Sequence, residues 1–217
     1  MLAVDVVLLR ALEGGLSLLL HRRAEGPFRG RLALPGVAVR ADETLEEAAR
    51  RALADKAGLP AEHQAGLHLE QLATFDALFR DPRGRTVSVA YLGLARPGSF
   101  DSGGIWRRQT ELARGSLPFD HDAIVVAALA RLAGKLRYTN IAARLLEPLF
   151  RLEEIQTVYE AILGRNLNRA NFRTKLLKIG LIERVGVEPA PGPQGGRPPH
   201  LYRFRHQRTE VTERDFL

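Results

Sequence analysis

Apolar residues gather in short runs along the first part of the chain, and turn-forming residues separate these runs. The runs at 2–10 and 16–22 flank the turn EGG, which is typical of two strands joined by a glycine turn. Two further strand-like runs, 67–78 and 86–95, are joined by the turn RDPRGR. An apolar-rich stretch at 121–136 is long enough to favour a helix.

The segment ETLEEAARRALADKAGL, residues 43–59, is typical of an amphipathic helix with defined ends. Thr44 and Glu47 have the spacing of a capping box, in which side chains satisfy the first free backbone amides. Gly58 suits the left-handed position that ends a helix. The order β-β-α-β-β-α then predicts an α+β domain, an α/β/α sandwich, that ends near Lys135.

The remainder of the chain has a different pattern. Helices are predicted at 138–146, 151–163 and 168–179, the last of them capped by Asn168. Two strand-like runs, 181–185 and 200–204, then flank a loop rich in proline and glycine. Three helices followed by a hairpin with a long loop are the outline of a winged helix-turn-helix.

The charge distribution supports a division into two domains, 1–134 and 135–217. The first part has 17 lysines and arginines against 16 aspartates and glutamates, whereas the second has 15 against 9. The net charge of +7 therefore lies almost wholly in the second part, as expected for a module that meets a polyanion. A surplus of solvated surface arginines would give the same totals.

The helix at 168–179 has a polar side suited to DNA. Phe172, Leu176 and Ile179 recur at helical spacing and should face the core. The opposite side offers amide, hydroxyl and cationic groups, which contact bases and phosphates in a major groove. A basic surface helix with solvated charges is the simpler alternative. The predicted DNA-binding residues are Arg169, Asn171, Arg173, Thr174, Lys175 and Lys178, with Arg197 in the hairpin loop for a minor groove or a phosphate.

Composition excludes several classes of protein. The chain has no cysteine, so disulfides and thiolate metal sites are excluded, and a reducing compartment suits it. The N-terminus lacks a basic segment and contains Asp5 and Arg10, so it fits a strand better than a signal peptide. No apolar run approaches the ~20 residues needed to cross a bilayer. We therefore expect a soluble, cytoplasmic protein that does not enter a membrane.

Residues 34–60, LPGVAVRADETLEEAARRALADKAGLP, resemble the Nudix box, G-x5-E-x7-R-E-U-x-E-E-x-G-U. Aligning its last glycine with Gly58 places Arg51 at the motif arginine and Glu43 at the early glutamate. Gly36 then takes the first glycine, with one extra residue between it and Glu43. The three carboxylates of the R-E-U-x-E-E segment fall at Ala52, Asp55 and Lys56.

In an active box these three carboxylates share one helical face and hold Mg²⁺ or Mn²⁺ against a diphosphate. Here two of the three are absent, and Lys56 places an ammonium group where a cation would lie. We therefore expect no metal site, no catalytic residues and no enzymatic activity. The box predicted to be degenerate consists of Glu43, Arg51, Ala52, Asp55, Lys56 and Gly58.

With both parts taken together, the chain resembles the Nudix-related transcriptional regulator (NrtR) family. The segments that carry this resemblance include RRAEGPFRGRLALPG, RDPRGRTVSVAYL, GKLRY, VYEAILGR, NFRTKLL and GRPPHLYRF. The resemblance implies a homodimer whose Nudix-like domain senses a metabolite without hydrolysing it, and whose winged helix binds operator DNA. It also implies an effector such as ADP-ribose or a related nucleotide, with no cofactor required.

One departure from the family lies beside the expected ligand cleft. The family commonly has a Gly-Gly pair after Leu-Pro, whereas this chain has Gly36-Val37-Ala38, and a β-branched residue restricts the backbone there. The arginines nearby could still neutralise a diphosphate. Each could instead be a solvated surface arginine, and this is the simpler interpretation of Arg80 and Arg83, because turns are commonly charged. The candidate effector-binding residues are Arg22, Gly36, Arg51, Arg80 and Arg83.

The chain is therefore interpreted as a dimeric transcription factor, most simply a repressor that binds a pseudo-palindromic operator and responds to a nucleotide. The main alternative is a Nudix hydrolase of ADP-ribose-type nucleoside diphosphates that carries an accessory DNA-binding domain. A third hypothesis is a DNA-binding protein whose first domain only dimerises.

Overall fold

The computed structural model describes residues 1–12, 15–98, 104–187, 198–206 and 208–211. Its contacts divide the chain into two compact units, unit 1 formed by Met1–Leu12 and Leu16–Arg131 and unit 2 chiefly by Leu132–Leu217. The division falls inside helix α2 (His121–Leu136), close to the expected boundary after residue 134. The chain therefore passes from one unit to the other within a helix and not through a linker.

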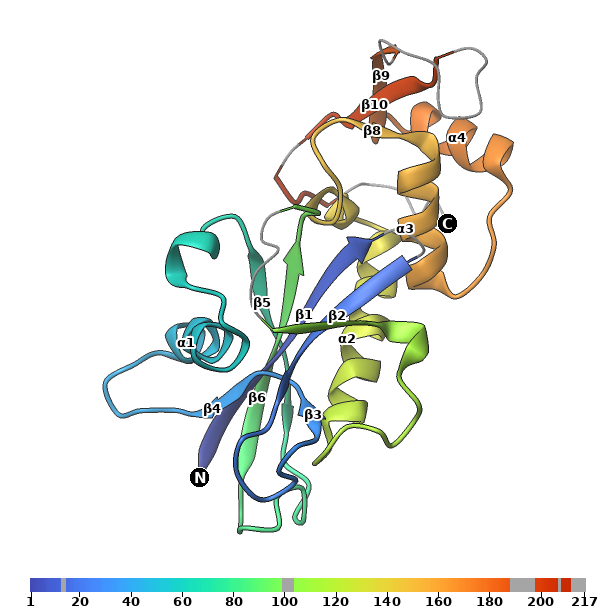
Figure 1. The fold of residues 1–217 in the computed structure, drawn as a ribbon. Coiled ribbons are helices and arrows are strands. Elements are labelled where there is room, and N and C mark those ends of the chain that lie inside the picture. Colours follow the sequence, from blue (N-terminus) through green and yellow to red (C-terminus); the bar gives the residue numbers. More distant parts are fainter. Residues whose placement is uncertain (13–14, 99–103, 188–197, 207, 212–217) are drawn as a thin grey trace. The chain divides into compact units, whose positions relative to one another are not determined.

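A mixed sheet forms the centre of unit 1 (Figure 1). Its strands are β1 (Leu2–Leu12), β2 (Gly15–Arg22), β3 (Leu32–Ala33), β4 (Gly36–Ala38), β5 (His68–Phe75), β6 (Val87–Ala95) and β7 (Ile105–Arg108). The main order is β3-β2-β1-β6-β5, while β4 pairs with β1 and β7 pairs with β2. β1 and β6 run parallel with Val4 opposite Val89. The strands β3, β4 and β7 were not predicted, because each is too short for an alternation of apolar and polar residues to be recognised.

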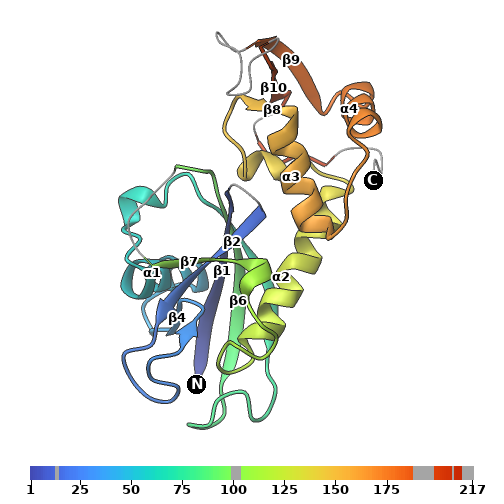
Figure 2. The same ribbon diagram turned by 45° about the vertical axis from the view of Figure 1, so that its right-hand side comes forward.

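Helix α1 (Leu45–Ala57) and helix α2 cover opposite faces of this sheet (Figures 1 and 2). The buried side of α1 is built mainly from alanines and packs on the β1 residues Val4, Val6 and Leu8. Such small side chains let the helix axis lie close to the sheet, which brings the exposed side of α1 near the ends of the strands. Two short 3-10 turns, Ala61–His63 and Gln109–Glu111, lie in the connections.

Both predicted ends of α1 are confirmed. The hydroxyl of Thr44 accepts a hydrogen bond from the backbone amide of Glu47 at 3.2 Å, and the Glu47 carboxylate accepts one from the Thr44 amide at 2.7 Å. Gly58 adopts φ +63°, a left-handed conformation that disfavours a side chain. The helix is therefore fixed at both ends by local sequence.

Unit 2 has the expected outline of a winged helix. It contains helices α3 (Leu152–Leu163) and α4 (Arg169–Lys178) and a three-stranded sheet in the order β8-β10-β9. The strands are β8 (Phe150–Arg151), β9 (Ile182–Val187) and β10 (His200–Phe204), all antiparallel to their neighbours. The ring of Tyr159 on α3 lies 5.0 Å from that of Phe172 on α4, so aromatic packing joins the two helices.

The prediction of a helix at 138–146 was wrong in extent, because only a 3-10 turn forms, at Ile141–Arg144. The polar side chains of Thr139 and Asn140, just before this turn, form hydrogen bonds with backbone groups and so compete with a longer helix. The hydroxyl of Thr139 accepts from the amide of Ile141 at 3.2 Å. The side chain of Asn140 donates to the carbonyls of His206 and Arg208 and accepts from the amide of Glu210. This Asn140 clasp joins the segment that precedes α3 to the segment that follows β10.

Across the described ranges, none of the helices combines the length and the apolar character that spanning a membrane would demand.

A candidate effector cavity and a candidate DNA interface

A cavity of about 560 Å³ lies in unit 1, beside the paired strands β1 and β4 and the exposed side of α1. Its wall also includes the residues after β2 and the loops that precede β6 and α2. Cationic and imidazole groups predominate among its charged residues. They are His21, Arg23, Arg40, Arg51, Lys56, Arg80, Arg83 and His121, against the carboxylates Asp5, Glu25, Asp55 and Asp81.

Four of the five predicted effector-binding residues line this cavity, namely Gly36, Arg51, Arg80 and Arg83. The fifth, Arg22, is exposed outside it and donates to the carbonyl of Gly30 at 2.6 Å. Successive side chains of a strand point to opposite sides, so His21 and Arg23 enter the cavity while Arg22 does not. The apolar run LSLLL before them is buried on both sides, so its pattern could not reveal which neighbour faces the cavity.

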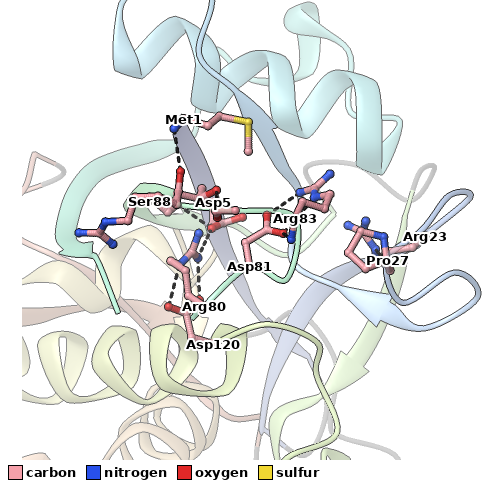
Figure 3. A network of polar contacts seen from close by, with 12 residues as sticks. Met1, Asp5, Arg23, Pro27, Arg80, Asp81, Arg83, Ser88 and Asp120 are labelled. Carbon is pink, nitrogen blue, oxygen red and sulfur yellow. Dashed lines mark hydrogen bonds and ion pairs between the residues drawn. The ribbon is translucent and has the colours of Figure 1, made fainter. Parts of the chain in front are cut away.

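A buried ion network forms one side of the cavity (Figure 3). Arg80 donates to both carboxylate oxygens of Asp120, at 2.8 and 2.6 Å, and to Asp5 at 3.1 Å. The hydroxyl of Ser88 donates to the same Asp5 oxygen at 2.6 Å. Burial acts to raise the pKa of Asp5, but His121, Ser88 and Arg80 together lower it to about 2. Asp5 is therefore held as an anion that anchors the Arg80 guanidinium.

His121, the first residue of α2, extends this network. The backbone amide of Leu34 donates to its Nδ1 at 3.1 Å, and its Nε2 lies 3.5 Å from the Asp5 carboxylate. Because Nδ1 accepts a hydrogen bond, the ring proton is on Nε2 and points at Asp5. This role of His121 was not predicted from the sequence, where the residue only begins an apolar-rich helix.

Two further cavity arginines are engaged by carboxylates. Arg51 donates to both oxygens of Glu43, at 2.8 and 2.6 Å, and these hydrogen bonds are the main reason that the pKa of Glu43 falls to about 2. Arg83 donates to both oxygens of Asp81, at 3.0 and 2.7 Å. Each of the three predicted arginines that line the cavity, Arg51, Arg80 and Arg83, thus already forms an ion pair with a carboxylate.

Arg23 differs from these arginines. Its Nε donates to the carbonyl of Pro27 at 2.7 Å, and its guanidinium carbon lies 4.8 Å from the centre of the Phe119 ring. Within the described ranges, no carboxylate forms an ion pair with it. Burial and then the nearby Arg83 lower the pKa of Arg23. The charges of Asp81, Asp5 and Glu25 act in the opposite direction, but among the described residues none of them forms an ion pair with this cation.

An aromatic pair with strained backbone borders the cavity next to Arg23. Phe119 and Phe28 have φ values of +59° and +63°, which non-glycine residues rarely adopt. Their rings meet edge to face at 4.9 Å. Backbone strain of this kind persists only where the surroundings impose it and is concentrated at binding sites.

The Nudix-box positions have different environments. Ala52 is fully buried in the core under α1, whereas Asp55 and Lys56 are exposed and line the cavity. One Asp55 oxygen lies 3.5 Å from the Arg51 guanidinium. In the part of the chain that the structure describes, no three histidine, aspartate or glutamate side chains are grouped as a metal site would require.

The candidate DNA interface is helix α4. Phe172 and Leu176 are buried and Ile179 is partly buried, as expected for the core side. The helix contains four cations and no carboxylate, and Asn168 caps it by accepting from the amide of Asn171 at 3.0 Å. The predicted residues on the outer side are all exposed: Arg169, Asn171, Arg173, Thr174, Lys175 and Lys178.

Two of these residues have further contacts within unit 2. Arg169 forms an ion pair with Glu153 at the start of α3, which fixes its position at the N-terminus of α4. Arg173 lines a second cavity of about 400 Å³ together with Pro198 and Pro199. Arg197, the seventh predicted DNA-binding residue, lies outside the described residues.

Two family models match separate parts of the chain. Residues 1–124 match the NUDIX domain, and residues 142–204 match the NrtR DNA-binding winged helix domain. Among curated proteins, the ADPR responsive transcriptional repressor NtrR of Acinetobacter baylyi is 34% identical over 215 residues, covering 95% of this chain and 83% of that protein. An ADP-ribose pyrophosphatase of Methanocaldococcus jannaschii is 30% identical over 112 residues, which cover 50% of this chain and 63% of its own length.

Solved structures of Shewanella oneidensis NrtR are similar over both units. The protein alone matches with a TM-score of 0.80 and 29% identity over 99% of each chain. Its complex with a 27mer DNA matches with a TM-score of 0.76 and 30% identity, covering 94% of this chain and 93% of that one. Its NUDIX domain complexed with ADP ribose matches 61% of this chain and 88% of that one, with a TM-score of 0.52 and 32% identity.

Proposed function

Because this chain belongs to the NrtR family of Nudix-domain transcriptional regulators, we propose that it represses transcription by binding operator DNA and releases that DNA when a nucleotide occupies unit 1. The observation that carries the proposal is the coexistence of two cationic sites in one chain. One is the outer side of α4, and the other is the cavity of unit 1. The first suits DNA and the second suits a small anion.

Helix α4 supplies the contacts to DNA. Lys175 and Lys178 bind phosphates and position the helix, while Asn171 and Thr174 contact base edges. The similar S. oneidensis protein has been solved in complex with DNA, which supports this role for the winged helix. Arg197 in the hairpin loop is proposed to reach a phosphate or the minor groove.

The effector is ADP-ribose or a related nucleotide. The cavity volume of about 560 Å³ lies in the range of small-molecule sites, ~300–1,000 Å³. Support comes from the ADP-ribose complex of the similar NUDIX domain and from the ADPR response of the A. baylyi relative. A usable switch requires the ligand to prefer the DNA-free state by ~1–3 kcal/mol.

The regulator acts as a homodimer on a pseudo-palindromic operator. Two winged helices related by a two-fold axis contact half-sites about one or two helical turns apart, at ~34 Å per turn. The ligand changes the dimer geometry and so the distance that the two α4 helices can span. Dimerisation also places two cationic helices on one DNA molecule, which raises affinity without new contacts.

In this proposal the protein binds its nucleotide ligand without hydrolysing it. Two of the three carboxylates expected in the Nudix box are replaced, by the buried Ala52 and by Lys56. Hydrolysis of ADP-ribose is the second candidate function, and the similarity to the M. jannaschii pyrophosphatase favours it. The two candidates differ in whether ADP-ribose is consumed.

One pair of assays separates the candidates. Wild-type protein should shift a duplex obtained by in vitro selection, and added ADP-ribose should abolish the shift. In parallel, no AMP should form from ADP-ribose with Mg²⁺ or Mn²⁺. AMP formation that Asp55→Ala abolishes would establish the hydrolase, and a shift that no nucleotide affects would reduce unit 1 to a dimerisation domain.

A further inference from the structure

The Nudix resemblance implies a divalent cation at the diphosphate of a bound nucleotide, and the residues of this cavity do not fit one. A hard cation needs a group of carboxylate oxygens. Here Ala52 offers only a methyl group in the core, and Glu43 is engaged at both oxygens by Arg51. Asp55 is the one box carboxylate that is exposed to the cavity, and Arg51 lies beside it.

Two cations that line the cavity have no carboxylate within ion-pair distance among the described residues. Within the described ranges, neither Lys56 nor Arg23 forms an ion pair, whereas Arg51, Arg80 and Arg83 each do. Lys56 extends from the last turn of α1, and Arg23 directly follows β2. The two cations thus approach one cavity from different elements.

His21 provides independent evidence that both cations act on the same region. Its pKa is lowered first by burial and then by the charges of Lys56 and Arg23. Burial and both cations thus favour the neutral imidazole, which can donate or accept a hydrogen bond without adding charge. Such an arrangement costs free energy in the empty protein, and an anion would offset that cost.

We propose that Lys56 and Arg23 replace the divalent cation and bind the diphosphate of a nucleoside diphosphate ester directly, so that effector binding needs no metal ion. The inference rests on the proposed function, in which such an ester occupies this cavity. Arg23 lies over the Phe119 ring and donates through Nε to the carbonyl of Pro27 (Figure 3). These two contacts hold the guanidinium plane in one orientation, as a bidentate contact with a diphosphate requires. Lys56 supplies a point charge on a flexible four-carbon stem from the last turn of α1.

Calorimetric titration of the full chain with ADP-ribose tests this inference, in EDTA and again in Mg²⁺. Wild type should bind with the same Kd, within about twofold, in both buffers. Lys56→Gln and Arg23→Gln should each raise Kd by about tenfold or more, the usual loss for a charge-assisted hydrogen bond. Lys56→Arg keeps the charge and should retain binding.

The matched control is Arg22→Gln, because Arg22 neighbours Arg23 in the chain but lies outside the cavity. It should bind ADP-ribose as wild type does, and equal melting temperatures would show that all variants are folded. Binding by wild type only in Mg²⁺, or unchanged binding by Lys56→Gln and Arg23→Gln, overturns the metal-free site and leaves the proposed function intact. No binding in either buffer overturns the effector part of the proposed function itself.

Discussion

Gly36 lies so close to Asp5 that a side chain at position 36 would occupy the place of the Asp5 carboxylate. The two residues are partners across the β1–β4 pair, and a Cβ at Gly36 would lie 2.2 Å from Oδ1 of Asp5. The first glycine of the Nudix-like motif therefore serves the buried ion network of this protein. Its importance comes from contact and not from backbone freedom.

Gly36→Ala should destabilise unit 1 by about 1–3 kcal/mol, because the added methyl group displaces Asp5 from Arg80 and Ser88. Scanning calorimetry would record this as a loss of several degrees in melting temperature. Gly66→Ala is the control, since a Cβ there meets no atom within 4 Å. Equal melting temperatures for the two variants would contradict the predicted clash.

Asp5 should stabilise the protein in a pH-dependent way. Its pKa is about 2 in the folded chain against 3.8 ordinarily, so the folded state favours the anion. The resulting stability, roughly 2 kcal/mol, is fully present above pH 4 and is lost as the pH falls toward 2. Melting temperatures of wild type and Asp5→Asn should therefore differ at pH 7 and converge in acid. A difference that stays constant down to pH 2 would show that the Asp5 charge contributes nothing.

Changes on α4 should separate phosphate contacts from base contacts. Lys178→Ala should weaken binding to all DNA sequences alike and reduce the slope of log K against log salt by about 0.9. Asn171→Ala should instead reduce discrimination against a changed base pair by about 1–3 kcal/mol. Fluorescence anisotropy at several salt concentrations measures both. Arg114→Ala, an exposed arginine of unit 1, should change neither quantity.

The C-terminal cap of α1 should matter for stability alone. Gly58→Ala places a side chain at φ +63° and should cost about 1 kcal/mol. Its melting temperature should fall, while the Kd for ADP-ribose at a temperature where the variant is folded should stay unchanged. A large rise in that Kd with no change in melting temperature would assign Gly58 to ligand binding.

Local features of this chain were predictable from sequence, and contacts between distant segments were not. The ends of α1 follow from Thr44, Glu47 and Gly58, because a cap involves residues only a few positions apart. The inner side of α4 follows from the spacing of Phe172 and Leu176. The pairing of Asp5 with Arg80 joins residues 75 positions apart, and no local pattern encodes it.

The cavity shows the same contrast. The sequence offered Arg51, Arg80 and Arg83 as candidates for binding a diphosphate, although Arg80 and Arg83 fitted a charged surface turn equally well, and all three line the cavity. The sequence-based prediction chose Arg22, but its neighbour Arg23 lines the cavity instead. Adjacent side chains of an extended chain point to opposite sides, so an error of one position changes which residue faces the ligand. The sequence also did not show that carboxylates would already engage these arginines, either from nearby positions, as Glu43 engages Arg51 and Asp81 engages Arg83, or from distant ones, as Asp120 engages Arg80.

The Asn140 clasp has a consequence for how such a chain can arise. It joins Asn140, which precedes the winged helix, to Glu210, which follows its last strand β10, so the segments on both sides of this domain lie side by side. A domain whose ends are adjacent can be appended, removed or exchanged as a cassette while its interior stays unchanged. Gene fusion could thus join a DNA-reading module to a nucleotide-binding one through a single peptide connection, with neither core redesigned.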